Sequence, residues 1–95
     1  MAEQYDFKVT KSLSLENSFG TIKQEEGIEI DVTVGINDED SGWFELYDVE
    51  TGGEDWYAEG GLEFDGMDIV GYDGVFELPD FIVNKLVELG YKDEL

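Results

Sequence analysis

The sequence predicts an α+β fold, in which an antiparallel sheet of about five strands carries one C-terminal helix on its apolar face. Two observations lead to this prediction. Apolar and polar residues alternate over much of residues 5–72, as they do in strands with one buried face. After Pro79 the apolar residues recur at helical spacing instead. Because 95 residues is the size of one domain, we expect a single domain over residues 1–95.

Two strands are expected in the N-terminal third. Residues 5–15 alternate, and Lys11 interrupts the apolar row, which indicates a strand end or a sheet edge. Residues 16–20 are typical of a turn, whereas residues 21–26 fit a short strand or a loop. The most regular strand pattern covers residues 27–36, where five branched apolar residues occupy every second position: Ile28, Ile30, Val32, Val34 and Ile36.

Three further strands are expected before the helix. Residues 43–49 present aromatic side chains to both faces, and Gly52-Gly53 predicts a hairpin connection to residues 56–64. Gly60-Gly61 within the latter strand indicates a bulge or a close approach of another backbone. The last strand covers residues 67–72, between the turn signals Asp65-Gly66 and Asp73-Gly74.

The period change after these turns predicts the helix. Pro79 suits the first helical position, and the carboxylate of Asp80 suits the positive end of the helix dipole. Gly90 is a natural C-terminal stop. The apolar residues at helical spacing are Leu78, Phe81, Ile82, Leu86 and Leu89.

Charge is the most unusual property of the chain. Twenty-five acidic residues against five lysines give a formal net charge of −20, and arginine and histidine are absent. Between Lys23 and Lys85 lie sixty-one residues without a positive charge and with nineteen carboxylates. Apolar residues make up 41% of the chain and aromatic residues 14%, so the composition is that of a folded domain rather than a disordered acidic tail.

Several function classes are disfavoured by this composition. Direct nucleic-acid binding is not expected, because phosphate contacts need lysine and arginine. Without histidine or cysteine, neither a nucleophilic triad nor a thiolate metal site can form, and no glycine pattern matches a phosphate-binding loop. A carboxylate pair at glycosidase spacing would arise by chance among so many acids. We therefore expect a protein that is not an enzyme and needs no cofactor.

Targeting signals and membrane segments are also not expected. Residues 1–7 are charged and contain no apolar core of a signal peptide, and no apolar run approaches the ~18 residues of a membrane span. The sequence Lys92-Asp93-Glu94-Leu95 spells an endoplasmic-reticulum retention signal. Because that signal acts only in the secretory pathway, we interpret it as coincidence and expect a cytoplasmic protein without membrane contact.

Residues 37–48 loosely follow the twelve-residue calcium loop of EF-hands, with Gly42 at the required glycine position. The departures are an asparagine as first ligand, Asp48 instead of a bidentate glutamate as last ligand, and strands instead of helices on both sides. An acidic β-turn explains the segment better, so no metal site is predicted. Weak calcium binding remains an alternative.

The carboxylates themselves are the candidate site. Alternate residues of a strand lie ~7 Å apart and neighbouring strands ~4.8 Å apart, so carboxylates on one face would form rows with spacings comparable to those of nucleic-acid phosphates. The aromatic residues Trp43, Tyr47, Trp56 or Tyr57 would anchor a partner if exposed, or fill the core if buried. The predicted partner-binding residues are Glu29, Asp31, Asp38, Glu39, Asp40, Trp43, Glu45, Asp48, Glu50, Glu54, Asp55, Glu59 and Glu63.

A resemblance supports this interpretation. Residues 57–64 (YAEGGLEF) and residues 72–79 (YDGVFELP) resemble small uncharacterised proteins encoded by tailed phages. The resemblance covers roughly the C-terminal half of the chain and assigns no residue a role. Several small acidic phage proteins are DNA mimics that block host nucleic-acid machinery, so the resemblance implies an inhibitor that evades host defence.

We therefore expect a non-enzymatic acidic binding protein that mimics nucleic-acid charge and masks a basic surface of a host nucleic-acid-binding protein. It would act in the host cytoplasm as a monomer or homodimer. The alternative is a small structural or regulatory interaction domain whose acidity serves solubility and whose contacts are made by aromatic residues.

Overall fold

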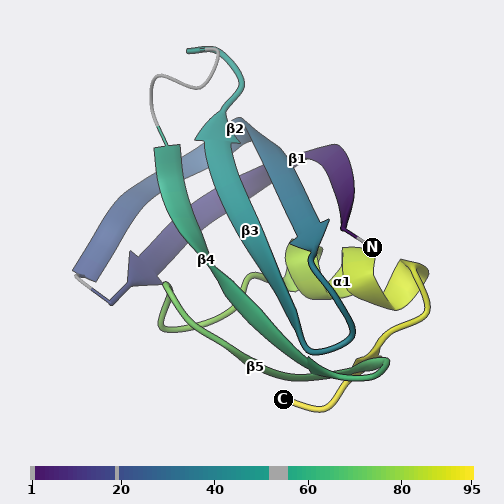
Figure 1. The fold of residues 1–95 in the computed structure, drawn as a ribbon. Helices are drawn as coiled ribbons and strands as arrows, with labels where there is room; N and C mark the ends of the chain where they lie inside the picture. The colour runs from purple at the N-terminus through teal and green to yellow at the C-terminus, as the bar shows by residue number, and fades with distance from the viewer. Residues whose placement is uncertain (1, 19, 52–55) are drawn as a thin grey trace.

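The computed structural model describes residues 2–18, 20–51 and 56–95. These residues form a six-stranded sheet that curls into a half-barrel around one short helix (Figure 1). The strands lie in the sheet in their chain order. The elements are β1 (Glu3–Asn17), β2 (Gly20–Ile36), β3 (Ser41–Asp48), β4 (Trp56–Asp65), β5 (Asp68–Tyr72), α1 (Asp80–Glu88) and β6 (Lys92–Asp93).

The prediction of a purely antiparallel sheet of about five strands is wrong in one respect. A sixth strand, β6, pairs with β5 in parallel, so the sheet is mixed. After Gly90, which has a φ of 103°, the Lys92 N–H donates to the Met67 carbonyl at 2.8 Å and the Glu94 N–H to the Ile69 carbonyl at 3.1 Å. A two-residue strand has no alternating pattern, so it left no signal in the sequence.

The hairpin of β1 and β2 is longer than predicted and contains a bulge. Residues 21–26 belong to β2, which resolves the choice between a strand and a loop. Lys11 pairs with Ile28 but Leu13 pairs with Glu25, so β2 holds one extra residue there. Gly27 has a φ of 69°, the left-handed conformation in which a bulge favours glycine. The bulge ends the regular pairing of β1 at Lys11, where the apolar row is interrupted.

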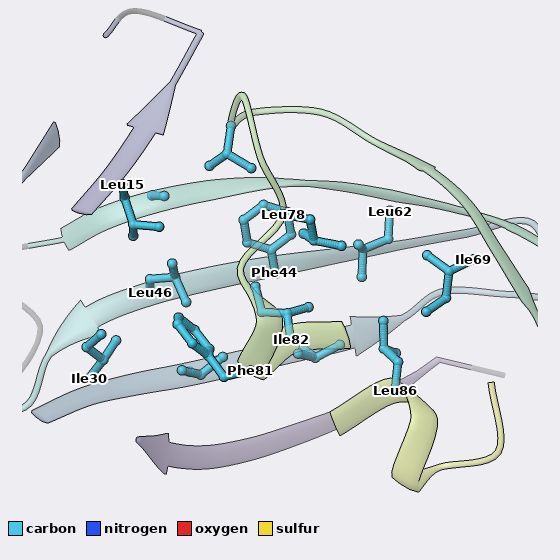
Figure 2. Packing of buried hydrophobic residues seen from close by; sticks show 14 of the residues in the cluster. Leu15, Ile30, Phe44, Leu46, Leu62, Ile69, Leu78, Phe81, Ile82 and Leu86 are labelled. Atoms are coloured by element: carbon cyan, nitrogen blue, oxygen red, sulfur yellow. The ribbon is translucent and has the colours of Figure 1, made fainter. Parts of the chain in front are cut away.

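The core fills the inner face of the curled sheet. Ile30, Val32 and Val34 of β2 are completely buried, as are Phe44 and Leu46 of β3. Helix α1 covers this face, and Figure 2 shows its core side chains among those of the sheet: Phe81, Ile82 and Leu86. The packing of the helix on the apolar face is confirmed. Burying ten or more large apolar side chains at ~1.5–3 kcal/mol each supplies the main driving force for folding.

The ends of α1 differ slightly from the prediction. Pro79 is the N-cap residue, with φ −58° and ψ 140°, rather than the first helical residue. Proline nevertheless suits this place. Its ring fixes φ near the observed value, and the backbone N–H that proline lacks would have no hydrogen-bond acceptor within the helix at this position. Asp80 lies in the first turn as expected, and Gly90 follows the helix in a left-handed conformation.

Candidate functional site

The outer face of the sheet is the candidate functional site. We use this name for the side chains that alternate with the buried ones on the first four strands: Asp6 and Lys8; Glu29, Asp31 and Thr33; Trp43, Glu45 and Tyr47; Glu59 and Glu63. All of them are exposed or half-buried. Because alternation places one set of residues in the core, the strand pattern itself sends the other set to solvent.

Strand register arranges three outer carboxylates and one threonine in a row across four strands. Thr33 of β2 pairs with Asp6 of β1 on one side and with Glu45 of β3 on the other. Glu45 in turn pairs with Glu59 of β4. The Thr33 hydroxyl donates to Asp6 Oδ1 at 2.8 Å, which orients that carboxylate. Neighbouring strands lie ~4.8 Å apart, so the row crosses the sheet in short steps.

Glu45 and Glu59 are a like-charged pair directly across two strands. Such a pair is destabilising in an isolated protein, because the two carboxylates repel each other at ~5 Å. Tyr47 lies on the same face, and its pKa is raised first by burial and then by the negative charges of Glu45 and Glu59. The Tyr47 hydroxyl is therefore close enough to both carboxylates to interact with them electrostatically. The three side chains form a compact acidic and aromatic cluster.

Trp43 lies beside this cluster, over a glycine of the neighbouring strand. Trp43 pairs with Gly35 of β2, and a Cβ added at Gly35 would lie 2.0 Å from Trp43 Cε2. The indole therefore occupies the space of the missing side chain. On the other side Trp43 pairs with Gly61 of β4. Two flanking glycines leave the indole half-exposed instead of enclosed by neighbouring side chains.

A shallow groove of ≈ 330 Å³ runs beside Trp43. One wall is the turn after β5, which packs against β4. The Gly61 N–H donates to Asp73 Oδ1 at 2.6 Å, and the Asp73 N–H donates to the Gly61 carbonyl at 3.0 Å. The residues lining the groove are Trp43, Phe44, Glu45, Glu59, Gly60, Gly61, Asp73 and Gly74.

The two adjacent glycines of β4 make this wall possible. A Cβ at Gly60 would lie 2.1 Å from the Asp73 carbonyl oxygen, and a Cβ at Gly74 would lie 2.3 Å from the Glu59 carbonyl oxygen. The close backbone approach predicted from Gly60-Gly61 is therefore confirmed. The bulge of β4 lies elsewhere. Tyr47 of β3 pairs with Trp56 and the adjacent Leu46 pairs with Ala58, so Tyr57 is an extra residue in β4.

Apart from Asp48, the predicted site residues divide into three groups. Six lie on the outer face: Glu29, Asp31, Trp43, Glu45, Glu59 and Glu63. Asp38, Glu39 and Asp40 are exposed in the loop between β2 and β3, and Glu50 is exposed in the turn that follows β3. Glu54 and Asp55 lie outside the described residues.

Asp48 was predicted as a partner-binding residue, but it does not belong to the outer row. It is three residues from Glu45, so alternation places it on the inner side, opposite the buried Ile30. The buried Tyr57 donates its hydroxyl to Asp48 Oδ2 at 2.8 Å, and the Glu50 N–H donates to Asp48 Oδ1 at 2.8 Å. Asp48 is a structural acceptor at the end of the core.

Tyr57 is not an exposed anchor either, because only 1% of its surface is accessible. It is the extra residue of the β4 bulge, which turns its ring toward the core. The side chain of Trp56, the other aromatic residue considered there, lies outside the part of the chain that can be described. Trp43 and Tyr47 are therefore the aromatic residues that the structure places on the candidate face.

The segment 37–48 does not form a calcium loop. Asp38 Oδ1 accepts the N–H groups of Asp40 and Ser41 at 2.8 and 2.9 Å, so it closes a tight turn. These two hydrogen bonds, Asp40 first, lower the pKa of Asp38. Residues 41–48 are a strand, which separates Glu45 and Asp48 onto opposite faces. Within the described ranges, no group of three or more acidic side chains is arranged to hold a metal ion.

Two carboxylates of the outer face and its groove, Asp6 and Asp73, were missed by sequence reasoning. Asp6 alternates with Tyr5 and Phe7, so the strand pattern could have placed it on the polar face. Its membership of the row depends on the pairing of β1 with β2. Asp73 carried only a turn signal, and its approach to β4 is a consequence of tertiary packing.

This arrangement is suited to bind a cationic side chain. An aromatic face beside two or three carboxylates can hold a guanidinium by stacking and by paired hydrogen bonds. Arginine fits better than lysine, because its planar group can do both at once. A cation between Glu45 and Glu59 would also remove their mutual repulsion.

Comparison with protein-family models, with curated proteins and with solved structures finds no match to this chain. In residues 2–18, 20–51 and 56–95 there is no helix of the length and apolarity needed to cross a membrane.

Proposed function

We propose that this chain is a non-enzymatic acidic binding protein that masks a basic, nucleic-acid-binding surface of another protein. The outer face would take the place of the nucleic acid. Its carboxylates would release the counterions of the partner's lysines and arginines, as phosphates do. Trp43 and Tyr47 would supply the aromatic contacts that make an interface specific.

The observation that carries this proposal is the direct pairing of Glu45 with Glu59 beside the half-exposed Trp43. Two carboxylates in this arrangement cost stability in the free protein and gain it when a cation binds between them. A surface whose acidity served solubility alone would have no need to place like charges opposite each other next to an aromatic groove. The row from Asp6 to Glu59 adds a third carboxylate two strands away, with the Thr33 hydroxyl between Asp6 and Glu45.

The resemblance of residues 57–64 and 72–79 to small tailed-phage proteins supports a more specific form of the proposal. In that form the partner is a host enzyme or regulator that binds nucleic acid in the cytoplasm, and the chain inhibits it. This step rests on the resemblance alone.

The test is affinity capture from a bacterial lysate on the immobilised full chain, with retained proteins identified by mass spectrometry. We expect a nucleic-acid-binding protein that double-stranded DNA displaces and that elutes as salt rises. The affinity should fall steeply with salt, because each neutralised charge contributes a counterion. A partner that resists high salt and ignores DNA would instead support the alternative of an aromatic interaction domain.

A matched pair of variants distinguishes the outer face from net charge. Glu45→Gln with Glu59→Gln removes two charges from the groove, whereas Glu77→Gln with Glu88→Gln removes two exposed charges from the far side of α1 and its preceding loop. We expect the first variant to weaken capture at least tenfold and the second to change it less than threefold. Equal losses in both variants would contradict a specific face.

A further inference from the structure

The outer edge of β1 is an unpaired sheet edge. β1 is the first strand in the sheet order, so β2 pairs with one of its edges only. At its far end the Phe76 N–H donates to the Glu16 carbonyl at 3.0 Å. Along Glu3–Lys11, no backbone hydrogen bond from another element of the described chain reaches the open edge. An edge of this length is a template for another strand.

Side chains along this segment are incompletely buried. Tyr5, Phe7 and Val9 pack against the core but remain half-exposed. Their partners on β2, which are Val34, Val32 and Ile30, are completely buried. The difference arises because β2 has a neighbouring strand on both sides and β1 has one. A further strand beside β1 would cover the remaining apolar surface of these three side chains.

Positive charge is concentrated at this edge. Lys8 and Lys11 lie on β1, and Lys85 of α1 places its Nζ 5.4 Å from the centre of the Phe7 ring. Three of the five lysines of the chain are therefore gathered at one strand. This is the part of an otherwise acidic surface where a second acidic molecule meets the least repulsion.

The segment is also complementary to itself. When two copies of Glu3–Lys11 run antiparallel with Phe7 opposite Phe7, Asp6 faces Lys8 of the other copy. In the same register Glu3 faces Lys11, Tyr5 faces Val9 and Gln4 faces Thr10. Every charged residue then meets an opposite charge, and every apolar residue meets an apolar one.

Neighbouring registers lack this match. Centring the pair on Asp6 or on Lys8 places like charges opposite each other, and centring it between two residues brings inner-face side chains opposite outer-face ones. Two contacts hold the acidic members in place: the Thr33 hydroxyl donates to Asp6, and the Tyr5 hydroxyl donates to Glu3. The regular part of β1 ends at Lys11, where the self-complementary stretch also ends.

We propose that the chain forms a two-fold symmetric homodimer through β1, in which the Glu3–Lys11 segments of two copies pair antiparallel with Phe7 at the centre. The dimer joins two six-stranded sheets into one continuous sheet. This inference does not depend on the proposed function, because it rests on the open edge of β1 and on the register in which two copies pair. Asp6 and Lys8 are the outer-face residues that it shares with the candidate site.

The test is sedimentation equilibrium of the full chain over a wide concentration range, with charge-reversal variants. We expect the mass of the native protein to rise from monomer to dimer with concentration. Asp6→Lys and Lys8→Asp should each weaken the dimer about tenfold or more, because each places like charges opposite each other at two symmetric positions. An equimolar mixture of the two variants should associate again, since every Lys then faces an Asp.

Two controls change net charge by the same amounts away from the edge. Asp65→Lys and Lys92→Asp alter exposed residues at the end of β4 and in β6. They should leave the dimer within threefold of the native protein. Circular dichroism of each variant checks that it is folded.

The outcomes separate clearly. A native protein that stays monomeric up to about millimolar concentration would overturn the proposal. A dimer that survives Asp6→Lys and Lys8→Asp unchanged would exclude β1 as its interface. Single variants that are monomeric alone and also in the mixture would overturn the register. The salt response distinguishes this dimer from the proposed partner complex: moderate salt screens the repulsion between two molecules of charge −20 and strengthens the dimer, but it weakens binding to a basic partner.

Discussion

At the scale of single residues, the position of the Trp43 indole depends on the absence of a Cβ at Gly35 of the neighbouring strand. The indole lies where a side chain at Gly35 would be. Glycine is unfavourable in a strand, because it loses more backbone entropy on folding than other residues and buries no side chain. Gly35 therefore costs some strand stability and leaves room for the half-exposed indole of Trp43.

This dependence predicts the effect of Gly35→Ala. The added Cβ would displace the Trp43 ring and lower the free energy of unfolding by about 1–3 kcal/mol. In a Trp43→Ala background the same change should be neutral or stabilising by up to about 1 kcal/mol, because alanine restricts the unfolded chain. Urea denaturation of the four proteins of this double-mutant cycle measures both values. Equal costs in both backgrounds would show that Trp43 is not the cause.

At the scale of elements, the carboxylate of Asp38 adds to the backbone hydrogen bonds that hold the loop between β2 and β3. Asp38 accepts the N–H groups of Asp40 and Ser41, and the Ser41 hydroxyl lies 3.3 Å from the same oxygen. A charged acceptor is stronger here than a neutral one, which is why the pKa of Asp38 is lowered. The carboxylate thus connects the two strands that contribute most of the outer face.

The lowered pKa predicts a pH dependence for this loop. A carboxyl whose pKa is lower in the folded than in the unfolded protein stabilises the folded state at pH values above its unfolded pKa, which is 3.8 for Asp38. This stabilisation is lost as the pH falls through the pKa of the folded state. The melting temperature of the native protein should therefore exceed that of Asp38→Asn at neutral pH, and the difference should shrink below pH 3.8. Asp40→Asn, which removes the same charge from the same loop, is the control. A difference that stays constant down to about pH 2 would contradict the assignment.

At the scale of the whole molecule, charge and curvature act together. The chain carries a net charge of −20 on a body with a radius of gyration of 12.8 Å. Charges this close repel one another throughout the folded state, and the unfolded chain relieves that repulsion by expanding. The sheet curls around α1 (Figure 1). The apolar core side chains lie on its inner face, and the carboxylates of the outer face are exposed or half-buried. Stability of the isolated protein should therefore depend strongly on screening.

We expect the melting temperature to rise with sodium chloride between about 0.02 M and about 0.5 M, as the Debye length falls well below ~10 Å. If screening relieves about 1 kcal/mol of repulsion, the rise is about 4–8 °C for a domain of this size. A variant with Glu29, Glu45 and Glu59 all changed to Gln should melt higher in low salt and respond less to added salt. A melting temperature that falls with salt would mean that attractive ion pairs, not repulsion, dominate the surface.

Local patterns in the sequence determined which side of each strand faces the core. Alternation in residues 27–36 predicted the buried Val32 and the outward Glu29, because a pleated strand sends successive side chains to opposite faces whatever lies next to it. In residues 43–49 it placed Phe44 opposite Trp43, but aromatic residues on both faces left open which face is buried. The helix was equally predictable, since helical spacing and the Pro79 and Gly90 signals are local. The acidic character of the outer face follows from composition.

Only the tertiary structure decided which of these residues meet. The pairing of Glu45 with Glu59 depends on the register between β3 and β4, and the inward turn of Tyr57 toward Asp48 depends on the bulge in that register. The parallel β6 and the wall of the groove at Asp73 depend on where the chain returns after α1 and β5. Such contacts join residues far apart in the chain, and their geometry results from closing the whole sheet around one core, which no local pattern records.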